Sequence, residues 1–500
     1  MQPVRAVSLI LVVGWMLCAR ACALAEPADQ ALAVTISPDQ ILASEFLGFG
    51  VEWEYEGDHP ELNLDNPVWQ GHWPEMLERI DFMRPSIVRV MHTAPMYTRL
   101  DDGRVVADYD SPRMQVMYRL LDYARDRDIP VVLGEWLLPQ PYVEPLGGVG
   151  GPRWSGEVIV PFLVHLLQAK GYGNIRWFNL INEPTDYDIW KSAITNLHEA
   201  LTRQGLDRAL AIVGTDGPGD FSGWIERVAK DAGLRDRIGA YEYHIYAHLK
   251  TDKWLPSLLE GKLETDELLL RRRIVSAEDP RGAGKPFFMG EAGIADGNAG
   301  DNQTNRAGFR YGVWMADYAI QSMRAGLAGL IAWDMDDAMH TWGSYGGLGL
   351  KGWGFWNSLA GFGGYSENDF ELRPWFYTWS LLCRLFPRGS QTLAATSTGD
   401  PSCRVAAARL PQGRGLSFAV VNEADAARTI VLRMPGTSPA NLYEYRYFEV
   451  ARTADERGCP RVSRVRLSAD LEAGVKILLP ASGVVFLTND DPAQGSPAGR

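Results

Sequence analysis

One glutamate stands where an apolar segment has to end. Glu183 follows the apolar part of RWFNLINEPTDYD and lies between Asn182 and Pro184. Because Pro184 has no backbone N–H and disfavours an α conformation in the residue before it, a strand cannot continue past Glu183. The sequence predicts a carboxylate held at a strand exit, although one Glu in this setting also fits an ordinary turn.

A second glutamate, Glu291, ends the apolar run PFFMGEAG. Period-two alternation predicts that Phe287, Met289 and Glu291 share one face of a strand, and Gly290 lets a backbone or ligand approach closely. Two carboxylates that face each other are what hydrolysis of a glycosidic bond requires: one protonates the leaving oxygen, and the other attacks or activates water. For either residue alone, a buried ion pair is the alternative.

The elements that must position these carboxylates follow a regular order. From about residue 45 to 335, short apolar strands alternate with helical stretches, which predicts a (β/α)8 barrel, a fold of ~250 residues or more. An open doubly wound sheet is the alternative, but no glycine-rich phosphate turn follows the first strand. The predicted strands are 46–53, 86–91, 130–136, 174–182, 209–215, 240–246, 286–292 and 327–333, and the helices include 114–128, 158–171, 189–205, 309–326 and 374–386.

In such a barrel the loops at the carboxyl ends of the strands hold the active site. Glu183 ends the fourth predicted strand and Glu291 ends the seventh. These strands lie on opposite sides of an eight-membered ring, so the two carboxylates are expected to face each other across its rim. The pair therefore favours a catalytic role more strongly than either residue does.

The chain changes character after residue 387. Short strands separated by turn residues predict a C-terminal antiparallel β-sandwich over 388–489, following the barrel at 45–387. The segment 26–44, which contains the strand-like ALAVTISP, is expected to join this sandwich, and residues 490–500 are expected to be disordered. The predicted sandwich strands are 404–410, 416–423, 429–434, 442–450, 464–468, 475–480 and 483–488.

The first 25 residues have the pattern of a secretory signal peptide. Arg5 gives a positive start, an apolar core comes next, and Ala23-Leu24-Ala25 is a small-x-small cleavage site. The core is short for a membrane span, with an uncleaved anchor as the alternative. The sequence predicts a secreted or periplasmic protein.

Composition narrows the class of partner. A formal net charge of −13 argues against nucleic acid or an anionic membrane surface as a partner, because both attract a basic face. The 17 Trp and 19 Tyr are compatible with core packing, and Trp beside Gly in loops also suits stacking against a sugar ring. We expect a carbohydrate partner and no cofactor, and the oligomeric state stays open.

Three cysteines remain after the signal peptide, with no metal-ligand spacing: Cys383, Cys403 and Cys459. In an oxidising compartment, Cys403 and Cys459 are the two that would pair, leaving Cys383 buried. The sequence leaves the paired and free states open.

Together these motifs resemble clan A glycoside hydrolases, the retaining (β/α)8 enzymes. Asn182-Glu183-Pro184 matches the Asn-Glu pair that this clan carries after strand four, and PFFMGEAG matches its nucleophile motif after strand seven, in a form nearest to family 5. The first strand and the sandwich look more like families 30, 39 and 79. GEWLLPQP also lacks the His that family 5 members usually carry after strand three, so the family stays open.

The resemblance implies a role for each matching residue. Glu183 would be the acid/base and Glu291 the nucleophile of a double displacement with retention, their carboxyl groups ~5–5.5 Å apart. Asn182 would bind the 2-hydroxyl of the sugar. Arg89, on the second strand, matches the clan's arginine that supports the nucleophile with its positive charge, a role close to that of a structural ion pair.

Other candidates come from the same resemblance. His244 and Tyr246 alternate with Glu242 on the sixth strand and resemble the clan's His and Tyr there, the Tyr hydroxyl donating to the nucleophile. Trp333, after strand eight, matches the clan's aromatic platform under the sugar. Core packing is the alternative for each.

The remaining candidates rest only on a predicted position at the rim. Glu135 and Trp136, after the third strand, are expected to contact sugar hydroxyls, and Glu52, Trp53 and His92 are weaker candidates of the same kind. The acids of the run Asp334-Met335-Asp336-Asp337 are expected to be solvated loop residues rather than metal ligands, because no His accompanies them.

The sequence thus predicts an exported retaining β-glycosidase with a bell-shaped pH profile on the acidic side of neutrality. The alternative is a non-catalytic carbohydrate-binding protein on the same barrel. Sugar, linkage and endo or exo action stay open. The aromatic loop 340–365 would either wall off a pocket or line a long cleft with its tryptophans, Trp342, Trp353 and Trp356.

Overall fold

The structure is a computed structural model that describes residues 31–53, 67–136, 143–218, 222–249, 254–296, 303–339 and 352–492. The predicted signal peptide, Trp342 and the end of the predicted disordered tail lie outside these residues. None of the helices in the described ranges has the length and apolar character needed to span a bilayer.

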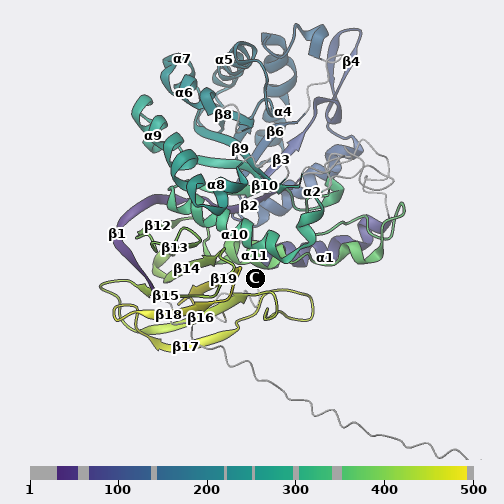
Figure 1. The fold of residues 1–500 in the computed structure, drawn as a ribbon. Coiled ribbons are helices and arrows are strands. Elements are labelled where there is room, and N and C mark those ends of the chain that lie inside the picture. The colour runs from purple at the N-terminus through teal and green to yellow at the C-terminus, as the bar shows by residue number, and fades with distance from the viewer. Residues whose placement is uncertain are drawn as a thin grey trace, which may run out of the picture.

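Eight parallel strands close into a barrel in the order β10-β11-β2-β3-β6-β7-β8-β9 (Figure 1), so the predicted fold class is confirmed. Each strand coincides with a predicted one, with ends that differ by a few residues. The strands are β2 (Gly48–Glu52), β3 (Ile87–His92), β6 (Val131–Glu135), β7 (Ile175–Asn179), β8 (Ala211–Pro218), β9 (Ala240–His248), β10 (Phe287–Ala295) and β11 (Gly329–Ala332).

Helices cover the outside of this ring. The predicted helix 158–171 is split, because α4 lies between two π-helical turns, Trp154–Ile159 and His165–Ala169. The helices are α1 (Pro67–Met83), α2 (Pro112–Asp126), α4 (Val160–Val164), α5 (Tyr187–Arg203), α6 (Ser222–Lys230), α7 (Ala232–Arg235), α8 (Leu255–Leu259), α9 (Leu269–Glu278), α10 (Phe309–Arg324) and α11 (Trp375–Leu385).

Alternation along the strands sorts residues into two groups. A small apolar cluster inside the barrel contains only strand residues, among them Ile87 on β3 and Ala240 on β9. The residues between these positions, such as Val88 and Tyr241, pack in the larger cluster shared with the helices. Because side chains alternate with period two, residues two and four places beyond the interior ones also face inward. This rule decides which polar residues reach the centre of the rim.

The second sheet has nine strands in the order β17-β16-β19-β14-β13-β12-β1-β15-β18. It is mixed rather than purely antiparallel, because β1 pairs antiparallel with β12 and parallel with β15. Its strands are β1 (Leu32–Phe46), β12 (Ser390–Ala395), β13 (Cys403–Arg409), β14 (Leu416–Asn422), β15 (Arg428–Arg433), β16 (Ala440–Tyr447), β17 (Arg464–Ala469), β18 (Val475–Leu479) and β19 (Gly483–Thr488).

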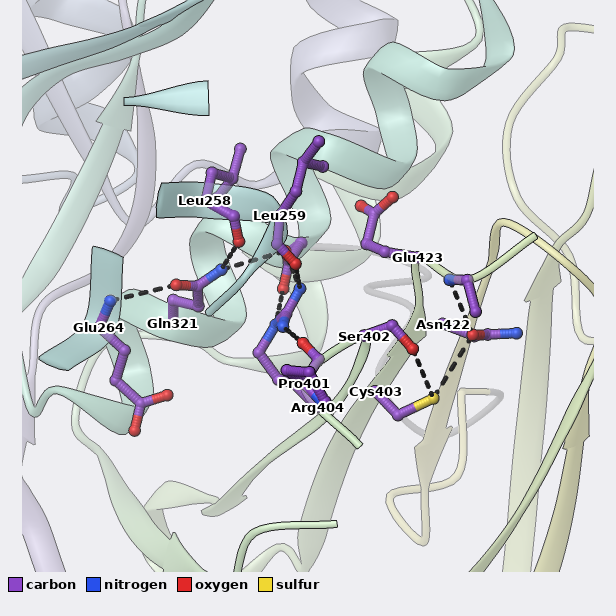
Figure 2. Close-up of polar contacts among 12 residues, drawn as sticks. Leu258, Leu259, Glu264, Gln321, Pro401, Ser402, Cys403, Arg404, Asn422 and Glu423 are labelled. Carbon is purple, nitrogen blue, oxygen red and sulfur yellow. Dashed lines mark hydrogen bonds and ion pairs between the residues drawn. The ribbon is translucent and has the colours of Figure 1, made fainter. Parts of the chain in front are cut away.

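Helices α10 and α11 lie between the barrel and this sheet (Figure 1). Arg404 on β13 donates to Asp317 on α10 through two nitrogens, each 2.5 Å from a carboxylate oxygen. Figure 2 shows the surroundings of Arg404 together with Cys403, whose thiol lies 3.4 Å from the Asn422 side-chain oxygen. Cys383, Cys403 and Cys459 are all buried free thiols, so Cys403 and Cys459 are not paired.

A buried acid, Glu423, lies at this junction (Figure 2). Neither of its carboxylate oxygens has a hydrogen-bond partner among the described residues, and the nearest cation, Arg310, is 3.9 Å away. Burial, and after it the negative charge of Asp317, raises the pKa of Glu423 to about 8. The folded protein therefore holds a proton here that the unfolded chain, with a Glu pKa of ~4.3, releases.

Glu423→Gln should remove a pH dependence of stability. A group whose pKa is higher in the folded state stabilises at low pH, and that contribution is lost as pH rises from about 4.5 towards 8. Melting temperatures of the variant and the parent should therefore be similar at pH 5, and the variant should melt higher at pH 8.5. The control is Asp425→Asn, because Asp425 is 98% exposed in the adjacent loop. An equal difference at both pH values would contradict the prediction.

Candidate active site

One buried arginine connects most of the candidate site. Arg89 on β3 is 1% exposed and faces inward. Its Nη1 donates to Glu52 Oε2 on β2 and to Glu291 Oε1 on β10, and its Nη2 donates to Asn182 Oδ1, each at 2.6 Å. Charge-assisted bonds of this kind are about twice as strong as neutral ones. The guanidinium thus joins two strands and the segment after β7 at one point.

The second oxygen of Glu291 is also held. The Tyr246 hydroxyl, on β9, donates to Oε2, which is the contact that the resemblance implied. Burial, and after it the charge of Glu291, raises the pKa of Tyr246 well above its ordinary value, so the phenol keeps its proton and remains a donor. Glu291 is therefore a buried carboxylate, and hydrogen bonds orient both of its oxygens.

Glu291 reaches the interior only because β10 carries a bulge. Phe288 packs inside the barrel, so strict alternation would point Glu291 outward. The pairing with β9 shifts register between Met289 and Glu291, and the extra residue, Gly290, reverses the facing of the residues after it. The prediction that Phe287, Met289 and Glu291 share a face is therefore wrong, because Phe287 and Met289 pack in the larger cluster shared with the helices.

Glu183 lies beyond the strand rather than on its last residue. β7 ends at Asn179, earlier than predicted. Glu183 has φ 45°, a left-handed conformation that costs a residue other than glycine about 1–2 kcal/mol. Pro184 disfavours the right-handed helical alternative. Asp186 then caps α5 by accepting from two backbone amides, so the chain turns into a helix just after Glu183.

A histidine joins the two carboxylates. His244 on β9 is fully buried, and its Nδ1 lies 2.9 Å from Glu183 Oε1 and 3.5 Å from Glu291 Oε2. The Glu183 side chain is 40% exposed. Glu183 can thus meet a molecule from solvent while the imidazole orients it.

One atom each from Glu183, His244 and Glu291 all lie within 4.8 Å of one another, a spacing that could also hold a cation. The hydrogen bonds from His244 and Tyr246 already engage these atoms, so the geometry needs no ion to explain it. The two carboxylates predicted from opposite sides of the ring are therefore neighbours in space.

Glu135 is placed differently from the sequence prediction. Val132 packs inside the barrel, so alternation turns Glu135 outward, where it is fully buried. Its oxygens accept from the Ala94 backbone N–H at 2.6 Å and the Tyr97 hydroxyl at 3.2 Å, and His92 Nδ1 lies 3.0 Å away. Burial raises the pKa of Glu135 despite these partners. The predicted sugar contact is replaced by a structural role.

Other predicted rim residues share that outward placement. His92 and Trp53 are buried in the layer between barrel and helices, where Trp53 stacks on Trp73 at 6.2 Å. Glu52, in contrast, faces inward and accepts from Arg89. The structure therefore keeps Glu52 in the site and removes Trp53 and His92 from it.

Aromatic rings line the side of the site formed by β11. Trp136 and Trp333 stack at 5.2 Å with nearly parallel planes, and Trp353 lies 5.1 Å from Tyr246. These rings form one small cluster that includes Tyr246, the residue whose hydroxyl donates to Glu291. Trp353 reaches it because Gly293 has no side chain: a Cβ there would come 2.7 Å from the Trp353 ring. Trp356 is instead part of the core, with Arg79 over its ring.

The acids after β11 are buried, so the prediction of solvated loop acids is wrong. Asp337 accepts from Arg306 and Arg373, and Asp336 accepts from the backbone amides of Ala338 and Ser358. Burial raises the pKa of Asp336 to about 6. These acids anchor the returning chain beside the site.

The fold has known counterparts among solved structures. A GH30 endoxylanase from Clostridium papyrosolvens C71 superposes with a TM-score of 0.60 at 12% identity, covering 92% of this chain and 100% of that chain. A GH39 enzyme from Xanthomonas axonopodis pv. citri gives 0.60 at 14%, covering 92% and 97%. A GH51 α-L-arabinofuranosidase from Thermotoga petrophila RKU-1 gives 0.60 at 12%, covering 91% and 99%.

No protein family model matches the chain, and no curated protein matches it. At these identities the structural matches establish the fold. The predicted resemblance to clan A glycoside hydrolases is therefore confirmed as a likeness in fold, and family 30 and family 39 structures are among those with that fold.

Proposed function

We propose that this chain is an exported retaining glycosidase in which Glu183 is the acid/base and Glu291 the nucleophile. The observation that carries the proposal is the approach of the two carboxylates, whose nearest oxygens lie within 4.8 Å. Retaining enzymes place these groups ~5–5.5 Å apart, whereas inverting enzymes need ~6.5–9.5 Å to admit a water molecule.

The surroundings of the pair suit a division of roles. Glu291 is buried and accepts hydrogen bonds from Arg89 and Tyr246. These bonds orient its carboxylate for attack on the anomeric carbon. Glu183 is partly exposed. Such exposure is needed by a group that donates a proton to a leaving group and accepts one from water. Asn182 Oδ1 is occupied by Arg89, so its amide NH2 is the group oriented to donate to a sugar hydroxyl.

The reaction then proceeds in two steps. Glu291 forms a bond to the anomeric carbon while the glycosidic C–O bond breaks and Glu183 protonates the departing oxygen. A water molecule next gives its proton to Glu183 and attacks the same carbon, and Glu291 leaves as a carboxylate. Two inversions give net retention.

Structures with this fold suggest which sugars to test first. They include a GH30 endoxylanase, a monomeric beta-xylosidase from Caulobacter crescentus CB15 and an alpha-L-arabinofuranosidase. We therefore propose a pentose-containing polysaccharide or oligosaccharide as the first substrate class, with β-linkages favoured, and the Trp136–Trp333 cluster beside the bound sugar.

The test is the stereochemistry of hydrolysis. The protein is screened against xylan and against aryl β-xylosides, β-glucosides and α-L-arabinofuranosides, and proton NMR identifies the first product formed from any substrate cleaved. Retention of anomeric configuration is expected. Inversion would refute the nucleophile role of Glu291, and saccharide binding without hydrolysis would favour the non-catalytic alternative.

A further inference from the structure

A second carboxylate lies behind the histidine that holds Glu183. Glu242 on β9 is 1% exposed, and its Oε1 lies 3.2 Å from His244 Nε2. The other ring nitrogen, Nδ1, faces Glu183 at 2.9 Å and Glu291 at 3.5 Å. The fully buried imidazole is thus bracketed by carboxylates on both nitrogens.

The bulge on β10 makes room for this carboxylate. A Cβ on Gly290 would come 1.8 Å from Glu242 Oε1 and 2.3 Å from its Cδ. Any residue other than glycine at 290 would therefore push Glu242 away from His244. The same residue that turns Glu291 inward thus also seats Glu242 under the ring. Since Glu242 is buried beneath His244, its influence on a substrate has to pass through that ring.

The charges around His244 favour a ring that carries two protons. Among the described residues, the cation near His244 is Arg89, and its guanidinium is already paired with Glu52 and Glu291. Tyr246 donates its proton to Glu291 rather than to the imidazole. Opposite charges within ~4–6 Å favour the charged form of a histidine, and burial opposes it. Glu242 supplies the buried counter-charge on the Nε2 side, where neither Glu183 nor Glu291 lies.

We propose that Glu242 is a positioning residue: it holds the His244 ring as a doubly protonated donor whose Nδ1–H orients the acid/base Glu183 and favours its carboxylate form. The inference rests on the proposed function, because Glu183 acts as acid/base only in a glycosidase. The positive ring helps Glu183 to act as the base of the second step, and it limits the pH range in which Glu183 carries the proton needed for the first step.

Glu242→Gln keeps the shape of the side chain and removes its charge. Without the counter-charge the ring loses a proton at lower pH, and Glu183 no longer faces a cation. Because Glu183 contacts Nδ1 whereas Glu242 lies beyond the ring, loss of the positive charge dominates at Glu183. The basic limb of the kcat/KM profile should move to higher pH by on the order of one unit. Glu423→Gln, which removes a buried carboxylate outside the site, should leave both limbs in place.

A readout independent of activity completes the test. The chain has 8 His, so 15N-histidine labelling gives a tractable NMR spectrum in which a His244→Asn variant assigns the ring. We expect both His244 nitrogens to be protonated at pH 7 in the parent protein and one to be deprotonated in Glu242→Gln. A neutral His244 ring in the parent, or equal protonation and equal pH profiles in both proteins, would overturn the inference. If no glycoside is hydrolysed, the proposed function fails, and the NMR result still decides the state of His244.

Discussion

Replacing Glu291 with Gln should lower kcat/KM for every glycoside that the parent hydrolyses, by on the order of 10⁴-fold or more. The amide cannot form the covalent bond to the anomeric carbon, and no other carboxylate described is placed to do so with both oxygens oriented. Gln retains an oxygen that Arg89 can bind, so the fold should persist. Steady-state kinetics with an aryl glycoside and a melting curve measure the two properties.

Chemical trapping makes this prediction specific. A 2-fluoro glycoside with a good leaving group should add its sugar to Glu291 in the parent protein, and peptide mass spectrometry should find the label there. The Gln variant should stay unlabelled. As a control, Asp425→Asn changes an exposed acid and should behave as the parent does. Activity of the Gln variant within tenfold of the parent, or a label on another residue, would rule out the assigned nucleophile.

Replacing Glu183 with Ala should produce a loss that depends on the leaving group. For substrates with poor leaving groups, kcat/KM should fall by about 10²–10⁴-fold, the usual contribution of a general acid. For a dinitrophenyl glycoside, whose leaving group needs no protonation, kcat/KM should change little. The second step should then limit turnover, because no base activates water.

Added azide distinguishes this role from a structural one. Azide is a nucleophile that needs no general base, and the space left by the Glu183 side chain, 40% exposed in the parent, can admit it. Turnover of the dinitrophenyl glycoside by Glu183→Ala should therefore recover with azide and yield a glycosyl azide of retained configuration. Equal losses for all leaving groups, without rescue, would contradict the acid/base assignment.

Much of the fold was predictable because local patterns agree with it. The eight barrel strands are short apolar runs bounded by turns and helices, and eight such strands alternating with helices favour the closed ring that the structure has. The shared face of the polar residues of β9 was also predictable, because period two places Glu242, His244 and Tyr246 on one side of the strand. The position of Ala240 in the structure shows that this side is the interior one. Alternation with His244 was thus a signal for Glu242, although sequence reasoning gave it no role.

Other features could not be derived from strand patterns. The interior or exterior facing of Glu135 depends on which face of β6 meets the barrel centre, and the strand does not reveal it because no residue before Glu135 in VVLGE has a polar side chain. The bulge at Gly290 depends on pairing with β9. The burial of Asp336 and Asp337 depends on a chain segment that returns about twenty residues later to supply their donors.

Local sequence patterns were sufficient to predict the order of the barrel strands and to place Glu183 and Glu291 near the carboxyl ends of the fourth and seventh strands, because strand periodicity and Pro184 act over a few residues. The likeness to clan A glycoside hydrolases came from the resemblance of the motifs around these two glutamates. Tertiary structure was needed to show that Glu291 faces inward, that Arg89 and His244 link it to the Asn182-Glu183 pair, and that Glu135 lies outside the site. Those relations are set by register between strands distant in sequence, and register is a property of the closed ring.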